Sequence, residues 1–157
     1  MHCTTKIVAS VKNLYVDPSA LLKLYLKEPE SRIMAAWRAK IGDPLLVTHH
    51  GRVELINAIG LACYRGMITE KIRDSAFGAL DDDFAVNRYR LADLLWRATL
   101  KRAGDLSRKH AATIGCRSLD VLHVASAVEL ELTHFVTFDV RQQQLARAAG
   151  LKIVIPA

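Results

Sequence analysis

Short apolar runs alternate with helical patterns along this chain, and this alternation limits its fold more than any other feature. The first run, Leu14 to Val16, passes directly into Asp17-Pro18, where Asp can cap a helix and Pro suits the first turn. Further strands are predicted at residues 45–48, 89–91, 134–138 and 151–155. Strands joined by helices form right-handed crossovers and a parallel sheet covered on both faces.

The spacing of apolar residues also predicts where the helices lie. One helix follows Pro18, a second restarts near Ile33, and others cover residues 52–64, a segment capped by Thr69, and residues 91–110, 119–132 and 141–149. The helix over 119–132, with Ser118 as its expected cap, is apolar nearly all round. We therefore expect it at the centre of the fold.

A chain of 157 residues, about half of them apolar, can bury a proper core without metal or disulfide staples. We expect one domain over residues 1–157, in which residues 1–12 could be an N-terminal extension. Three cysteines, far apart and without zinc-site spacing, suit a reducing cytoplasm. No apolar run approaches the length of a bilayer span and no export signal is evident, so a cytoplasmic location without membrane contact is expected.

Four carboxylates occupy equivalent places in this pattern. They follow the first and fourth strands, or lie in the opening turns of two helices: Asp17, Asp139, Asp120 and Glu54. Each alone could be a solvated side chain or a helix cap, and a cap contributes about 0.5 to 2 kcal/mol to stability. In a parallel sheet, however, such junctions meet at one edge, where four negative charges repel one another strongly. Their joint occurrence predicts a bound cation.

Hard oxygen ligands suit Mg²⁺ or Mn²⁺ better than zinc, and four negative charges leave room for one or two ions. Metal-assisted phosphodiester hydrolysis is chemistry that such a site performs. The formal net charge of +6 favours a polyanionic partner without naming one. Apart from the four acids, 12 acidic side chains face 22 basic ones, so the rest of the surface carries about +10. That distribution would guide a nucleic-acid backbone toward an acidic site.

Four segments in this order resemble the PIN-domain ribonucleases, specifically the VapC-type toxins. The segments are LYVDPSALLKLY, VELINAI, RSLDVLHVASAVEL and HFVTFDVRQQQLARAAGLKIV, which begin at residues 14, 53, 117 and 134. The resemblance implies an α/β fold of the PIN-like (Rossmann-like) type. This is a three-layer sandwich with a central, mainly parallel sheet of four to five strands and helices on both faces.

The resemblance also implies roles for particular residues. Asp17, Glu54, Asp120 and Asp139 would be the catalytic, metal-binding quartet, and the hydroxyls of Ser19 and Thr137 would orient carboxylates or water. For His123, one turn after Asp120, we favour a packed, hydrogen-bonded side chain over a general base. Lys23 and Arg117 are the basic residues that we would place at the RNA.

The implied activity is an Mg²⁺- or Mn²⁺-dependent endoribonuclease that cleaves RNA with a metal-activated water. The implied setting is a toxin–antitoxin pair, in which the toxin is a homodimer and a small cognate antitoxin neutralises it. The chain departs from the family pattern at Thr48-His49-His50-Gly51, which replaces a Ser-containing turn shortly before Glu54. We interpret the two adjacent histidines as turn or surface residues rather than as metal ligands.

Two other enzyme and signalling classes need residues that this chain lacks. A haloacid-dehalogenase-type phosphatase needs a second Asp where this chain has Ser19, and a receiver domain needs an acidic pair where Asp17 stands alone. The stronger alternative is a catalytically weak PIN-like module that binds RNA or protein. The intact carboxylates favour the enzyme, because a pure binder has no reason to keep a repulsive cluster.

Overall fold

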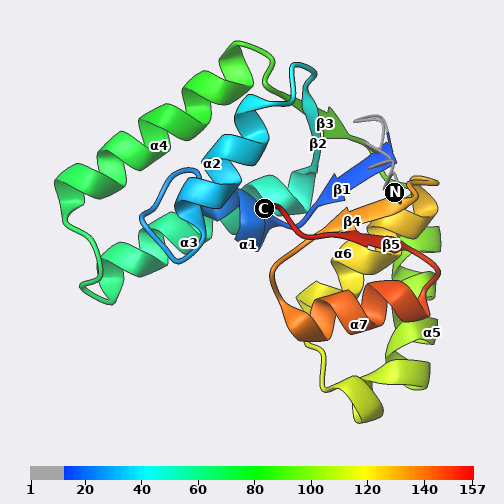
Figure 1. Ribbon diagram of the computed structural model, residues 1–157. Coiled ribbons are helices and arrows are strands. Elements are labelled where there is room, and N and C mark those ends of the chain that lie inside the picture. Colours follow the sequence, from blue (N-terminus) through cyan, green and yellow to red (C-terminus); the bar gives the residue numbers. More distant parts are fainter. Residues whose placement is uncertain (1–12) are drawn as a thin grey trace, which may run out of the picture.

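The computed structural model describes residues 13–157, in which short strands and helices alternate (Figure 1). The strands are β1 (Leu14–Val16), β2 (Leu45–Thr48), β3 (Tyr89–Ala92), β4 (His134–Val136) and β5 (Lys152–Val154). The helices are α1 (Pro18–Leu22), α2 (Ser31–Ala39), α3 (His49–Tyr64), α4 (Glu70–Ala85), α5 (Trp96–Ile114), α6 (Ser118–Glu129) and α7 (Val140–Ala148). The predicted alternation of strands and helices is confirmed.

All strand pairs are parallel, as the crossover pattern predicts. One ladder has the order β1-β4-β5 and a second joins β2 to β3, while β1 lies beside β2 (Figure 1). Val16 at the end of β1 is in register with Val136 at the end of β4. The sheet therefore consists of two hydrogen-bonded pieces set side by side.

Side chains that alternate along β1 explain the three layers. Leu14 and Val16 pack with α1 to α4, whereas Tyr15 packs with α6 and α7 on the opposite face, where part of α5 joins them. Figure 1 shows these two groups of helices on opposite sides of the strands, with α3 and α4 extending away as a hairpin. The expected PIN-like sandwich is confirmed. Among the described residues, no helix is both long enough and apolar enough to span a membrane.

Several elements begin or end a few residues from their predicted limits. Helix α3 starts at His49 rather than residue 52, because the Thr48 hydroxyl accepts the Gly51 N–H at 3.0 Å and caps the helix earlier. Helix α5 starts at Trp96 rather than residue 91, because residues 91 and 92 pair with β2.

The start of α6 and the end of β4 also differ from prediction. Ser118, the expected cap of α6, is its first helical residue, and Arg117 precedes it as the cap. Strand β4 ends at Val136, two residues early, so residues 137–139 form the turn into α7. This turn lies against Asp17, whose backbone N–H donates to the Val136 carbonyl at 2.9 Å.

Candidate active site

Asp17 is the first residue beyond β1 and is almost fully buried, with 4% of its surface exposed. Its side chain caps α1 by accepting the Ser19 N–H at 3.2 Å, and the Ser19 hydroxyl also donates to it. Gln142 Nε2 donates to the Asp17 Oδ1 atom at 3.0 Å. Burial raises the pKa of this carboxyl, since desolvation penalises its charged form.

Asp139 caps α7 at the neighbouring strand end. Its Oδ1 atom accepts the Gln142 N–H at 2.9 Å, and its own N–H donates to Thr137 Oγ1 at 3.1 Å. The Thr137 hydroxyl donates to Gln142 Oε1 at 2.9 Å. Gln142 thus binds Asp17 with its side chain and Asp139 with its backbone. Sequence reasoning missed this residue, and its only local signal was its place in the first turn after Asp139.

Glu54 lies in the second turn of α3, with 31% of its side chain exposed. Its Oε2 atom is 2.5 Å from Nε2 of His123, and Nδ1 of that ring is 2.6 Å from the Tyr15 hydroxyl. Burial lowers the pKa of His123, but the hydrogen bond to Glu54 and nearby negative charges, first that of Asp17, outweigh this effect and raise it. His123 is therefore the packed, hydrogen-bonded residue that we favoured.

Asp120 lies in the first turn of α6, where its Oδ2 atom accepts the Arg117 backbone N–H at 3.2 Å and Nε–H at 3.3 Å. Together with Asp139 it lines a pocket of about 310 Å³, whose rim carries Arg117 and Arg141. The Arg117 side chain is 81% exposed. This pocket combines two carboxylates with two guanidinium groups, a combination suited to a negatively charged ligand beside a cation.

Asp17 and Asp139 follow the ends of β1 and β4, and Glu54 and Asp120 lie in the opening turns of α3 and α6, but the four acids are not drawn into one tight group. Gln142 links Asp17 to Asp139, Asp120 shares a pocket with Asp139, and Glu54 lies near enough to Asp17 to affect its pKa. Over residues 13–157, no three or more His, Cys, Asp or Glu side chains are arranged so that they could hold a metal ion as they stand. The carboxylates are neighbours rather than a closed shell.

The histidines before α3 behave differently from each other. His49 is exposed and lies 3.2 Å from Asp93, as expected of a surface residue. His50 instead stacks on His123 with ring centroids 4.8 Å apart, and the edge of Trp96 meets it at 5.3 Å. Burial, helped by the charge of His123, lowers the pKa of His50 to about 4. Sequence reasoning missed this packing because nothing local marks it.

The two basic residues that we placed at the RNA differ as well. Arg117 reaches into solvent at the pocket rim, whereas the Lys23 side chain is only 12% exposed. The Lys23 ammonium lies 3.4 Å from Glu28 and 3.1 Å from Glu30, and it donates to the Pro29 carbonyl at 2.9 Å. Lys23 therefore has its hydrogen bonds within the protein.

Comparison with known proteins gives matches along most of the chain. A sequence model described as the PIN domain matches residues 14–148, a range that contains all four acids. Ribonuclease VapC47 of Mycobacterium tuberculosis (strain CDC 1551 / Oshkosh) is 30% identical over 148 residues, which cover 91% of this chain and 96% of the relative. Ribonuclease VapC46 of Mycobacterium tuberculosis (strain ATCC 25618 / H37Rv) is 28% identical over 146 residues, covering 92% and 98%.

Proposed function

Because this chain belongs to the PIN-domain family, as a VapC-type ribonuclease-like member, we propose that it is an endoribonuclease and the toxin of a toxin–antitoxin pair. The observation that carries the proposal is the Asp17–Gln142–Asp139 link, with Asp120 in the adjoining pocket. It keeps two carboxylates from distant strands beside an acidic pocket with a basic rim. A small cognate antitoxin and a second copy of the chain are the proposed protein partners.

The proposed cofactor is Mg²⁺ or Mn²⁺, one or two ions per site, held by Asp17, Glu54, Asp120 and Asp139. The donor set fits such an ion: all four supply hard oxygen atoms, and none of the ion pairs within residues 13–157 involves Asp17 or Asp139. Mg²⁺ keeps several waters and usually binds only one or two carboxylates directly, so a closed shell of side chains is not required. When bound, the ion would supply Lewis acidity toward the phosphate and the attacking water.

The chain's own residues would orient the groups around the scissile phosphate. Hydrogen bonds from Ser19 and Gln142 fix the Asp17 carboxylate and would keep its oxygens in one orientation. Arg117 and Arg141 at the pocket rim would attract the phosphate backbone and neutralise part of its charge. The acidic groups would thus serve the reaction, and the basic rim would bind the substrate.

The test is cleavage of RNA by the purified, antitoxin-free protein. We expect cleavage with Mg²⁺ or Mn²⁺ and none with EDTA, and a loss of at least a hundredfold in Asp17→Asn or Asp120→Asn. Asp105→Asn, on the exposed face of α5, is the matched control and should cleave normally. Equal cleavage in the presence of chelator would overturn the metal role.

The same variants separate a catalytic role from simple helix capping. Since burial raises the pKa of Asp17, its ionised form is unfavourable in the metal-free protein, and Asp17→Asn should leave the free energy of unfolding unchanged or higher. A large loss of metal-free stability would instead show that Asp17 acts chiefly as the cap of α1.

One observation favours a second candidate function, a catalytically weak module that binds RNA or protein. The four carboxylates are not arranged to hold a metal ion as they stand in the described residues. If the chain is such a module, the wild type and the Asp17→Asn variant should bind RNA with equal affinity. Neither should cleave RNA with any divalent ion. Metal-dependent cleavage excludes this candidate.

A further inference from the structure

His123 is a buried residue placed between two polar groups from different elements. It lies in α6 with 1% of its surface exposed, between the Tyr15 hydroxyl of β1 and the Glu54 carboxylate of α3. The two heavy-atom distances, 2.6 and 2.5 Å, place both groups within hydrogen-bonding reach of the ring. A row of hydrogen bonds thus runs from the core of the sheet to a partly exposed acid.

The chemistry of the carboxylate fixes the direction of the hydrogen bond to Glu54. An ionised carboxylate can only accept, so Nε2 of His123 carries a proton and donates to Glu54. At Nδ1 the Tyr15 hydroxyl serves either state of the ring, because it can donate to the neutral ring and accept from the charged one. Tyr15 therefore holds the ring in the orientation in which Nε2 faces Glu54.

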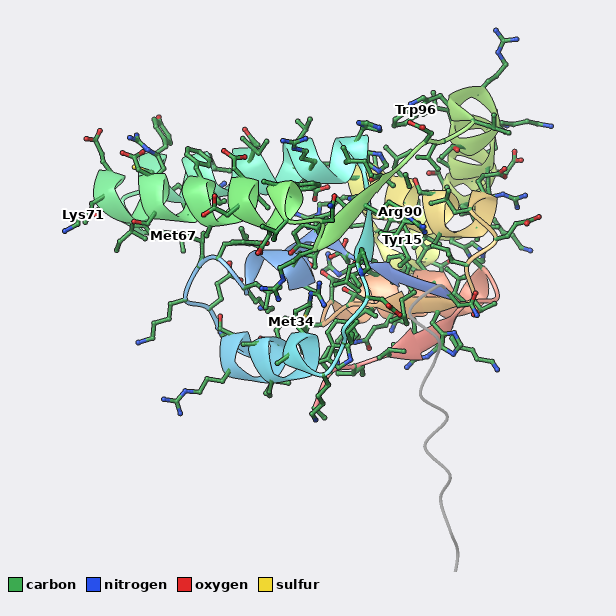
Figure 2. The ribbon with its side chains drawn as sticks, turned by 90° about the horizontal axis from the view of Figure 1, so that it is seen from above. Tyr15, Met34, Met67, Lys71, Arg90 and Trp96 are labelled. Carbon is green, nitrogen blue, oxygen red and sulfur yellow. The ribbon has the colours of Figure 1, made fainter. Side chains whose placement is uncertain are left out.

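The ring of His123 has little freedom to turn. His50 stacks on it at 4.8 Å with an angle of 24° between the ring planes. Tyr15 is itself fixed, because its ring stacks on Phe135 at 5.2 Å and only 2% of its surface is exposed. Figure 2 shows Tyr15 near the middle of the molecule, well inside its surface.

Glu54, by contrast, lies on a helix face that offers it little support. Val53 beside it is 65% exposed and Ile56 is 39% exposed, so although Leu55 anchors the helix, these two side chains do not cover Glu54. A flexible glutamate there would sample several rotamers. The hydrogen bond from His123 to Oε2 selects one of them and leaves Oε1 for a ligand.

We propose that Tyr15 and His123 are positioning residues that fix the Glu54 carboxylate for divalent-cation binding. This inference rests on the proposed function, because it assigns the two residues to the same acidic site. They act through Glu54 and contact neither the cation nor the RNA. Partners of this kind typically change metal affinity by 10- to 100-fold when they are removed.

Binding of Mn²⁺ alone to the full chain, measured by titration calorimetry, tests the proposal. His123→Asn cannot reach Glu54 and should weaken binding by about tenfold or more. His123→Gln places an N–H donor near the position of Nε2 and should restore most of the affinity. Tyr15→Phe keeps the ring stacked on Phe135 but removes the hydroxyl. It should weaken Mn²⁺ binding measurably, by less than about tenfold.

The matched control is Tyr25→Phe, which removes a tyrosine hydroxyl from a separate hydrogen-bonded group. The Tyr25 hydroxyl lies 2.5 Å from Asp83 and 2.6 Å from the Tyr89 hydroxyl. This variant should lose stability in thermal unfolding without any change in Mn²⁺ affinity. If Tyr25→Phe weakened Mn²⁺ binding as much as Tyr15→Phe, the effect would be general destabilisation and the proposal would be overturned.

Glu54→Gln distinguishes failure of this inference from failure of the proposed function. If Glu54→Gln weakens Mn²⁺ binding while His123→Asn and Tyr15→Phe bind normally, only the positioning role is overturned. If the wild-type chain binds no Mn²⁺, both proposals fail. A readout that needs no metal is the ¹⁵N spectrum of the His123 ring, in which an Nε2 atom without a proton would also overturn the proposal. Should His123→Asn not fold, the Tyr15 and Tyr25 pair decides.

Discussion

At the scale of single residues, Gln142 shows how one amide can hold two acids from distant strands. Its Nε2 atom donates to Asp17, its backbone N–H donates to Asp139, and its Oε1 accepts the Thr137 hydroxyl. The Gln142–Asp17 contact spans 125 residues of sequence. No local pattern could predict it, whereas the two acids were predictable because each follows a strand.

His50 should make stability depend on pH in a defined direction. Its pKa is about 4 in the folded chain and about 6.5 when unfolded, so between these values the unfolded state binds more protons. The free energy of unfolding contributed by His50 therefore falls as the pH drops from 6.5 to 4. Asp17 and His123, whose pKa values are raised, act in the opposite direction.

His50→Phe isolates this effect, because it keeps an aromatic ring against His123 and Trp96. Between pH 7.5 and 4.5 the wild-type chain should lose about 1 to 2 kcal/mol relative to the variant, after allowance for the partial exposure of His50. Urea denaturation at the two pH values measures this difference. A difference that stays constant with pH would contradict the buried, neutral state of His50.

Arg117 and Lys23 should contribute unequally to RNA binding, although both are basic and near the site. In the Asp17→Asn background, Arg117→Gln should weaken RNA binding several-fold and lower the slope of log affinity against log salt by about 0.7 to 0.9. Lys23→Gln should change the affinity less than about twofold, because its ammonium is already paired with Glu28 and Glu30. Filter binding over a range of salt concentrations measures both. Equal losses would show that Lys23 leaves its partners to bind RNA.

At the scale of secondary-structure elements, the start of α3 depends on a glycine. A Cβ atom at Gly51 would lie 2.9 Å from Thr48 Oγ1, the atom that caps the helix. Gly51→Ala should therefore displace the cap and cost about 1 to 2 kcal/mol. Gly60→Ala, in the same helix, meets no atom within 4 Å and should stabilise the chain by up to about 1 kcal/mol. Chemical denaturation of the two variants compares them, and a neutral Gly51→Ala would mean that the cap is unimportant.

The same helix shows why element limits are hard to predict. Thr48-His49-His50-Gly51 stands where the family pattern has a turn, and the helix was expected to start at residue 52. The cap of α6 was placed on Ser118 for its hydroxyl, but Asp120 instead accepts the Arg117 N–H and the helix starts at Ser118. Hydroxyl and acidic residues near helix ends offer competing caps, and packing chooses among them.

At the scale of the whole molecule, the alternation of strands and helices was enough to predict a parallel three-layer fold. It also placed Asp17 and Asp139 at one edge, because parallel strands end on the same side. What could not be predicted is how closely the acids approach one another, since that depends on side-chain rotamers and long-range contacts. Of the earlier expectations, the N-terminal extension at residues 1–12 lies outside the described residues.

The proposed reaction site is acidic, whereas the chain as a whole is basic. The chain carries +6 overall, while Asp17, Asp120 and Asp139 lie near the sheet edge beside two arginines at the pocket rim. Figure 2 shows the α3–α4 hairpin, marked by Met67 and Lys71, far from Trp96 at the start of α5. Trp96 contacts the ring of His50 at the start of α3, and His50 stacks on His123 next to Glu54.

The most direct measurement is anomalous X-ray diffraction from crystals of the chain soaked in Mn²⁺. We expect manganese peaks among the carboxylates of Asp17, Glu54, Asp120 and Asp139, which disappear in Asp17→Asn crystals soaked identically. Peaks elsewhere on the molecule with none at these carboxylates, or peaks that persist unchanged in the variant, would contradict it.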